Sequence, residues 1–142
     1  MRYTIDIVTS MIGASRRGFC PATIAWLLTD SRSLCFPDET LFFALQGKRD
    51  GHEYIRDLYD KGVRNFVVSR LPDRMDDYLE SNFLLVKDTL LALQTLAMAH
   101  RKAFSIPVIG ITGSNGKTIV KEWLYQLLEQ NYVVTRSPKS YN

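Results

Sequence analysis

Residues 41–52 read LFFALQGKRDGH, and this stretch decides the fold. Five apolar residues in a row predict a buried strand over Leu41–Leu45. The polar segment Gln46–His52, with its two glycines, predicts a loop where that strand ends. The next apolar residues recur at helical spacing on one face and are followed by the C-terminal signal Lys61-Gly62: Ile55, Leu58 and Tyr59.

Strands and helices alternate on both sides of this stretch. Further strands are predicted at Thr23–Thr29, Asn65–Ser69 and Phe83–Val86. Polar turns are expected at Asp30-Ser31-Arg32 and Pro37-Asp38-Glu39. The alternation indicates an α/β fold with a largely parallel sheet.

Two helices complete this part of the chain. Thr4 is expected to cap a short helix that Gly13 ends, with three apolar positions at helical spacing: Ile5, Val8 and Ile12. Asp88 or Thr89 is expected to cap a longer helix that runs to about Arg101. Its predicted apolar face consists of Leu90, Leu93 and Ala97.

The segment Gly110–Thr118 (GITGSNGKT) has the composition of a phosphate-binding loop. It lies between a predicted strand, Ile106–Thr112, and a predicted helix from Lys117 to about Glu129. The residues expected to face inward from that helix are Val120, Leu124, Leu127 and Leu128. A last short strand is predicted at Val133–Thr135.

The chemistry of such a loop follows from its residue types. Small residues let successive backbone N–H groups turn toward phosphate oxygens, and the helix adds its positive dipole end. We therefore expect ATP to bind at Gly113, Ser114, Asn115, Gly116, Lys117 and Thr118. Lys117 would act on the β- and γ-phosphates as the catalytic cation, and the Thr118 hydroxyl would be the Mg²⁺ ligand. One position departs from the usual pattern, because Ile111 stands where glycine is expected. The alternative is a glycine-rich strand-to-helix turn that binds nothing.

Composition excludes several other classes of protein. The 142 residues carry a net charge of only +3, so nucleic acid is not indicated. Cys20 and Cys35 lack metal-ligand spacing and are expected to be free thiols in a reducing compartment. No signal peptide or stretch of transmembrane length is found, so we expect a cytoplasmic protein without membrane insertion.

The predicted elements divide the chain near residue 103. Residues 1–102 contain enough elements for a small α/β domain, whereas residues 103–142 provide only the first βαβ of a second one. Two parallel strands do not form a stable sheet alone. We therefore expect the natural chain to continue, and the 142 residues alone to be catalytically inactive.

Four stretches, in this order and spacing, make the chain resemble the N-terminal part of a Mur ligase, an ATP-dependent amide ligase of peptidoglycan synthesis: Thr29–Arg32, Leu41–Gly47 with Asp50–His52, Val86–Leu90 with Ala92-Leu93, and Ile111–Thr118. The resemblance implies a substrate domain for UDP-muramoyl-peptide over residues 1–102 and the truncated start of a P-loop ATPase domain over 103–142. It also implies substrate-binding roles for Ser31, Arg32, Gln46, Gly47, Asp50, Gly51 and His52. The Gly47–Asp50 loop is one residue shorter than in relatives.

Within the family, Val120-Lys121-Glu122 and Ser140-Tyr141-Asn142 are most similar to the ligase that joins D-Ala-D-Ala to UDP-MurNAc-tripeptide through an acyl phosphate. The sequence of residues 137–142 is similar to that of ligases fused to an alanine racemase. Such a fusion would add pyridoxal phosphate as a cofactor. Two alternatives remain: the Mur ligase that adds the third amino acid, and a non-catalytic nucleotide-sugar-binding module. A small P-loop kinase is disfavoured, because such kinases usually open with the loop.

Overall fold

The computed structural model describes residues 2–137, and the chain divides between Phe104 and Ser105 into two compact units. Unit 1 contains seven strands and three α-helices: β1 (Tyr3–Thr4), α1 (Ile5–Ile12), β2 (Ser15–Arg17), β3 (Thr23–Ile24), β4 (Trp26–Leu28), β5 (Thr40–Phe43), α2 (Ile55–Asp60), β6 (Asn65–Val68), β7 (Asn82–Leu85) and α3 (Thr89–Lys102). Unit 2 contains α4 (Lys117–Leu128). The mixed α/β class predicted from the sequence is confirmed.

The main sheet of unit 1 has the strand order β2-β7-β6-β5-β4. Strands β4 to β7 are parallel, and β2 is antiparallel to β7. A separate two-stranded sheet pairs β1 with β3. The carboxyl ends of four parallel strands therefore share one edge of the main sheet, which is where α/β proteins bind ligands.

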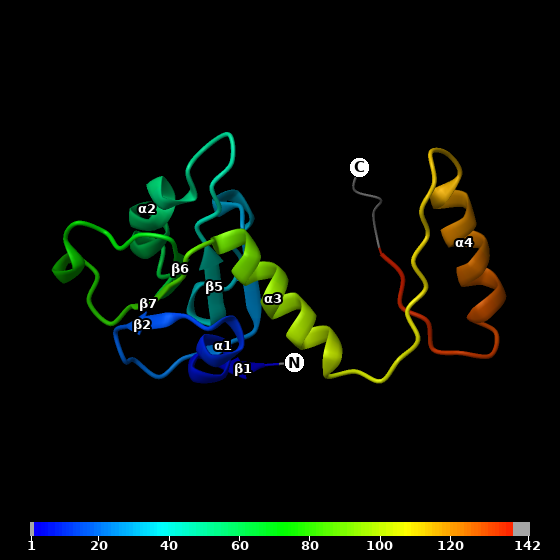
Figure 1. The fold of residues 1–142 in the computed structure, drawn as a ribbon, viewed down its shortest axis with the longest axis horizontal. Helices are drawn as coiled ribbons and strands as arrows, with labels where there is room; N and C mark the ends of the chain where they lie inside the picture. The colour runs from blue at the N-terminus through cyan, green and yellow to red at the C-terminus, as the bar shows by residue number, and fades with distance from the viewer. Residues whose placement is uncertain (1, 138–142) are drawn as a thin grey trace. The chain divides into compact units, whose positions relative to one another are not determined.

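Alternation along the strands produces two apolar layers, one on each face of the sheet. The register aligns Leu28, Phe42, Phe66 and Phe83 across the four parallel strands. These side chains pack with Ile55 and Leu58 of α2. On the opposite face, Leu41, Phe43, Val67 and Leu84 pack with α1 and α3. Figure 1 shows β5 and β6 between α2 and α3.

The caps of α1 and α3 agree with those predicted from the sequence, but the buried face of α3 differs from the predicted one. Thr4 caps α1 and Gly13 ends it with φ 62°. Asp88 caps α3 by accepting a hydrogen bond from the Leu91 N–H at 2.9 Å. The buried residues of α3 are Thr89, Ala92 and Leu96, whereas the predicted Leu90 and Ala97 are exposed. The prediction was wrong for Leu90 and Ala97, while Leu93 is partly buried against the core. Apolar residues surround most of this helix, so periodicity alone leaves its orientation open.

The predicted strand Thr23–Thr29 is two strands in different sheets. At Ala25 the backbone N–H donates to the carbonyl of Glu39 at 3.0 Å, and the chain passes from one sheet to the other. The prediction of a buried strand was also wrong for Trp26 and Leu27, which are half exposed because β4 is an edge strand. Trp26 stacks instead on Phe36 at 5.0 Å between ring centroids.

In unit 2 the predicted helix is confirmed and the predicted strands are not. Within the described part of this unit, neither Ile106–Thr112 nor Val133–Thr135 is a strand. A strand requires a hydrogen-bonded neighbour, and apolar sequence alone cannot supply one. Val120 and Leu127 of α4 are exposed, contrary to prediction, while Leu124 and Leu128 are partly buried. The predicted turn Ser140–Asn142 lies outside the described residues.

Candidate functional site

A cavity of about 470 Å³ lies at the carboxyl ends of β4 and β5. This volume is within the range of small-molecule sites, roughly 300–1,000 Å³. Its lining comes from the ends of both strands, from the turn after β4 and from the loop after β5: Thr29, Asp30, Ser31, Arg32, Phe42, Leu45, Gly47, Lys48, Arg49, Gly51 and Tyr54.

The turn after β4 holds a guanidinium at one wall of the cavity. Asp30 accepts a hydrogen bond from the backbone N–H of Arg32 at 3.0 Å, which starts the short helical turn Ser31–Ser33. Its carboxylate also accepts from Arg32 Nε at 2.9 Å and from Nη2 at 2.6 Å. These hydrogen bonds lower the pKa of Asp30 to about 2 and raise the pKa of Arg32. Both groups are therefore charged at neutral pH.

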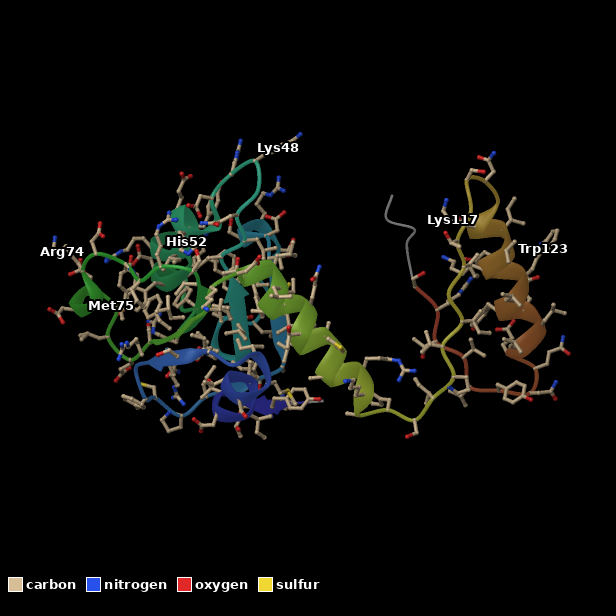
Figure 2. All side chains as sticks on the ribbon, in the orientation of Figure 1. Lys48, His52, Arg74, Met75, Lys117 and Trp123 are labelled. Atoms are coloured by element: carbon tan, nitrogen blue, oxygen red, sulfur yellow. The ribbon has the colours of Figure 1, made fainter. Side chains whose placement is uncertain are left out.

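The loop after β5 is short and internally bonded. Gln46 and Asp50 form an antiparallel bridge, and the Gly47 N–H donates to the carbonyl of Arg49 at 3.2 Å. The Gly51 N–H donates back to the carbonyl of Leu45 at 2.8 Å. This folding places Lys48 and Arg49 at the turn, and Figure 2 shows Lys48 at the tip of the loop.

Three side chains hold the base of this loop. Asp50 Oδ1 accepts from the His52 backbone N–H at 3.0 Å and contacts His52 Nδ1 at 2.6 Å. Asp50 Oδ2 accepts from Arg70 at 2.5 Å. The other ring nitrogen of His52 accepts from the Ser69 backbone N–H at 3.1 Å. The hydrogen bonds from the His52 N–H and Arg70 hold the pKa of Asp50 well below its ordinary value.

The lining of the cavity is suited to a ligand that combines an anionic group with a flat ring. Its wall contains the three cations Arg32, Lys48 and Arg49 and one carboxylate, Asp30, which Arg32 already neutralises. The remaining lining includes the apolar or aromatic side chains of Phe42, Leu45 and Tyr54. Cations favour phosphate groups, and aromatic faces favour a flat base.

A second cavity, of about 480 Å³, lies at the amino edge of the sheet. Its charged lining includes Asp38, Glu39 and Glu80, which disfavour an anion. Its one arginine, Arg64, donates to the carbonyls of Tyr59 and Val63 at 2.7 and 3.0 Å. The cavity at the carboxyl edge is therefore the better nucleotide site.

The structure brings together four of the predicted substrate residues, because Ser31, Arg32, Gly47 and Gly51 line one cavity. Gln46, Asp50 and His52 do not line it and belong to the base of the loop. Seven further lining residues were not among the predicted substrate residues: Thr29, Asp30, Phe42, Leu45, Lys48, Arg49 and Tyr54. The signal for Lys48 and Arg49 was their position in a loop at a strand end.

Unit 2 contains a second candidate site in the glycine-rich loop before α4. Gly113 and Gly116 have φ angles of 147° and 77°, which side-chain-bearing residues rarely adopt. Gly116 precedes α4, and no side chain caps this helix end. Lys117 Nζ reaches back over the loop and donates to the Gly113 carbonyl at 2.5 Å. Figure 2 shows Lys117 at the start of α4.

This geometry fits a phosphate group. Small residues with positive φ angles let a loop present backbone N–H groups to an anion, and a helix N-terminus adds its positive dipole end. The amine of Lys117 can move from the Gly113 carbonyl to a phosphate oxygen without leaving the loop. The predicted ATP-binding residues thus form one continuous structure, Gly113–Thr118.

Residues 2–137 contain no group of three histidine, cysteine or acidic side chains that could hold a metal ion by themselves. Cys20 and Cys35 are free thiols. Among the helices of this part of the chain, none has the length and apolar composition needed to cross a bilayer.

Known proteins have similar sequences and a similar fold. No family model matches the chain. It is 41% identical over 102 residues to the UDP-N-acetylmuramoyl-tripeptide–D-alanyl-D-alanine ligase of Rickettsia prowazekii, covering 72% of this chain and 22% of that one. The corresponding Bacillus subtilis ligase is 36% identical over 116 residues, covering 80% and 24%. The crystal structure of MurF from Acinetobacter baumannii aligns with a TM-score of 0.81 at 29% identity, covering 92% and 28%.

These similarities show that the chain belongs to the Mur ligase family. Within that family it is homologous to a part of MurF, the UDP-N-acetylmuramoyl-tripeptide–D-alanyl-D-alanine ligase. The chain spans about a quarter of the length of the curated relatives that it matches.

Proposed function

We propose that this chain is the part of an ATP-dependent ligase that binds the UDP end of UDP-MurNAc-tripeptide and the phosphates of ATP. The complete enzyme would join the tripeptide to D-Ala-D-Ala. The observation that carries the proposal is 41% identity over 102 residues to a protein named UDP-N-acetylmuramoyl-tripeptide–D-alanyl-D-alanine ligase. The cations that line the cavity suit the diphosphate of the UDP group, and the glycine-rich loop with Lys117 suits the phosphates of ATP. Both observations support the proposal.

Unit 1 would be the substrate domain. Lys48 and Arg49 stand at the cavity wall and would pair with the diphosphate, as would the free face of Arg32. The ring of Tyr54 would contact the uracil ring. Among the predicted residues, Ser31, Gly47 and Gly51 would shape the wall, whereas Gln46, Asp50 and His52 would support the loop.

Unit 2 would be the start of the ATPase domain. The backbone N–H groups of Gly113–Lys117 would hold the phosphates, and the Lys117 amine would offset charge on the γ-phosphoryl group as it moves to the substrate carboxylate. The Thr118 hydroxyl would be one ligand of Mg²⁺, which supplies electrostatic stabilisation of the phosphates when bound.

Two alternatives to this proposal and two further predictions remain open. The ligase that adds the third amino acid is the alternative reaction, and a non-catalytic nucleotide-sugar module is the alternative class. A cytoplasmic location and a fused alanine racemase with its pyridoxal phosphate stay predictions.

The test of the substrate site is an NMR titration of the 142-residue chain with UDP and, separately, with uridine. We expect UDP to shift the backbone signals of Ser31, Arg32, Lys48 and Arg49 together. The double variant K48A/R49A should weaken UDP binding about tenfold, roughly 1.4 kcal/mol, because two charge-assisted contacts are lost. Uridine binding should change little.

A matched control is Lys61→Ala, which removes an exposed cation at the end of α2 that forms an ion pair with Asp57. This variant should bind UDP like the unmodified chain. Signal shifts confined to the other cavity, or equal losses for UDP and uridine in K48A/R49A, would contradict the proposed diphosphate contacts.

A further inference from the structure

We infer that His52 is a positioning residue that fixes the cationic loop Gln46–Gly51, and that it does so as a neutral imidazole protonated on Nδ1. The inference deepens the proposed function, since the loop carries Lys48 and Arg49. It assigns to His52 a role through Asp50 and the end of β6 rather than a contact with the nucleotide.

The protonation state follows from the partners of the ring. The Ser69 backbone N–H lies 3.1 Å from His52 Nε2 and can only donate, so Nε2 must present its lone pair. The proton of the neutral ring is then on Nδ1, which donates to Asp50 Oδ1 at 2.6 Å. The Ser69 hydroxyl, 3.3 Å from Nε2, can add a second donor.

The burial of the His52 ring favours a role in positioning the loop over a contact with the ligand. The His52 side chain is 6% exposed, and both of its nitrogens are used within unit 1. A ligand in the cavity would have to displace one of these partners in order to reach the imidazole. Lys48 and Arg49 need no such displacement, because they stand at the cavity wall.

The ring connects the loop to the segment that follows β6. The loop returns to β5 through the Gly51 N–H and the Leu45 carbonyl. Asp50, at the end of the loop, is joined by His52 to Ser69, the residue after β6. Arg70 adds a second link from the same segment to the same carboxylate.

Hydrogen bonds to the ends of both β5 and β6 hold the loop in one orientation more firmly than hydrogen bonds to β5 alone. Without the imidazole, Asp50 would keep the backbone N–H of residue 52, which lies in the same segment, and the side chain of Arg70, which is exposed and therefore a weak partner. Lys48 and Arg49 would then sample more positions, and diphosphate binding would require ordering them again.

The first test is the tautomer of His52 in the unmodified chain, measured by the ¹⁵N shifts of its ring nitrogens. We expect a protonated Nδ1 and an unprotonated Nε2 at neutral pH. A proton on Nε2, or a doubly protonated ring, would overturn the inference. This measurement needs no ligand, so it stands even if UDP does not bind and the proposed function fails.

The second test compares His52→Ala with the control His100→Ala. His100 is the other histidine of the chain and contacts Tyr3 and Phe104. In H52A we expect increased fast motion of the Lys48 and Arg49 amides by ¹⁵N relaxation, about tenfold weaker UDP binding and uridine binding within about twofold. H100A should change none of these. Unchanged loop motion in folded H52A would overturn the inference.

If H52A does not fold, His52→Asn and His52→Gln replace it. Asparagine can donate to Asp50 but is too short to reach Ser69, and glutamine can accept from Ser69 while losing the Nδ1 position. We expect the loop to be mobile in both variants, because each keeps only one half of the link. A rigid loop with full UDP affinity in either variant would refute the requirement for both contacts.

Discussion

Two glycines in the candidate nucleotide loop offer a matched test of how this loop is built. A Cβ added at Gly51 would stand 2.7 Å from the Ala44 carbonyl carbon and from the Leu45 nitrogen. These are backbone atoms at the end of β5, and they cannot move aside by a side-chain rotation. A Cβ added at Gly47 would meet nothing within 4 Å. We therefore expect Gly51→Ala to destabilise unit 1 and Gly47→Ala not to.

The magnitude follows from the overlap. Carbon atoms in contact normally lie about 3.5–4.0 Å apart, so the loop must retreat by roughly 1 Å. That retreat strains the 2.8 Å hydrogen bond from the Gly51 N–H to Leu45. Overpacking of this kind costs about 1–3 kcal/mol. In a domain of this size, such a loss lowers Tm by roughly 4–20 °C.

The measurement is urea and thermal unfolding of the 142-residue chain, with the backbone signals of unit 1 followed by NMR. For Gly47→Ala we expect a free energy of unfolding within about 0.5 kcal/mol of the unmodified chain, or slightly higher because the unfolded state loses freedom. Equal stabilities of the two variants would refute the argument from close approach, as would a Gly51→Ala domain that unfolds at the unmodified Tm.

Three further predictions concern the core, the loop base and the phosphate loop. Phe66→Ala should lower the free energy of unfolding by about 3–5 kcal/mol in urea titrations, because Phe66 is fully buried between two other aromatic rings, whereas the exposed Phe19→Ala should cost little. The stabilisation from Asp50 should be complete above roughly pH 5 and lost as the pH falls, because its pKa is lower in the folded state; Asp50→Asn should flatten the pH profile of unfolding. Lys117→Ala should weaken ATP binding at least about tenfold, with the helix content by circular dichroism unchanged.

Each of these has an outcome that would count against it. A small cost for Phe66→Ala would show that the aromatic layer repacks without a cavity. Parallel pH profiles for Asp50→Asn and the unmodified chain would show that the carboxylate hydrogen bonds do not stabilise the fold. Unchanged ATP affinity in Lys117→Ala would leave Gly110–Thr118 as a structural turn.

Local patterns were sufficient for most elements of unit 1. The apolar run before Gln46 predicted β5, and its position next to a polar loop placed the candidate site at a strand end. Thr4, Gly13 and Asp88 marked helix ends that the structure confirms, because capping depends on residues within one turn. The helix α4 was predicted from the same kind of local pattern.

Patterns failed where the outcome depended on a distant segment. Residues 15–17 gave no strand signal, yet they pair with β7 as β2. The apolar run Ile106–Thr112 gave a strong signal, yet it has no strand partner within the described residues of unit 2. His52 could be read from the sequence as a ligand contact, and its two internal partners became visible only when Ser69 was placed beside it.

The sequence by itself determined the class of fold, the positions of the loops at strand ends and the residue types of the phosphate loop. These properties depend on backbone preferences and on spacing along a few successive residues. The tertiary structure decided the split between β3 and β4, the buried face of α3, the set of cations at the cavity and the tautomer of His52. Each of these depends on which groups far apart in the chain come within hydrogen-bonding or van der Waals distance, and such pairings are set by the packing of the whole domain.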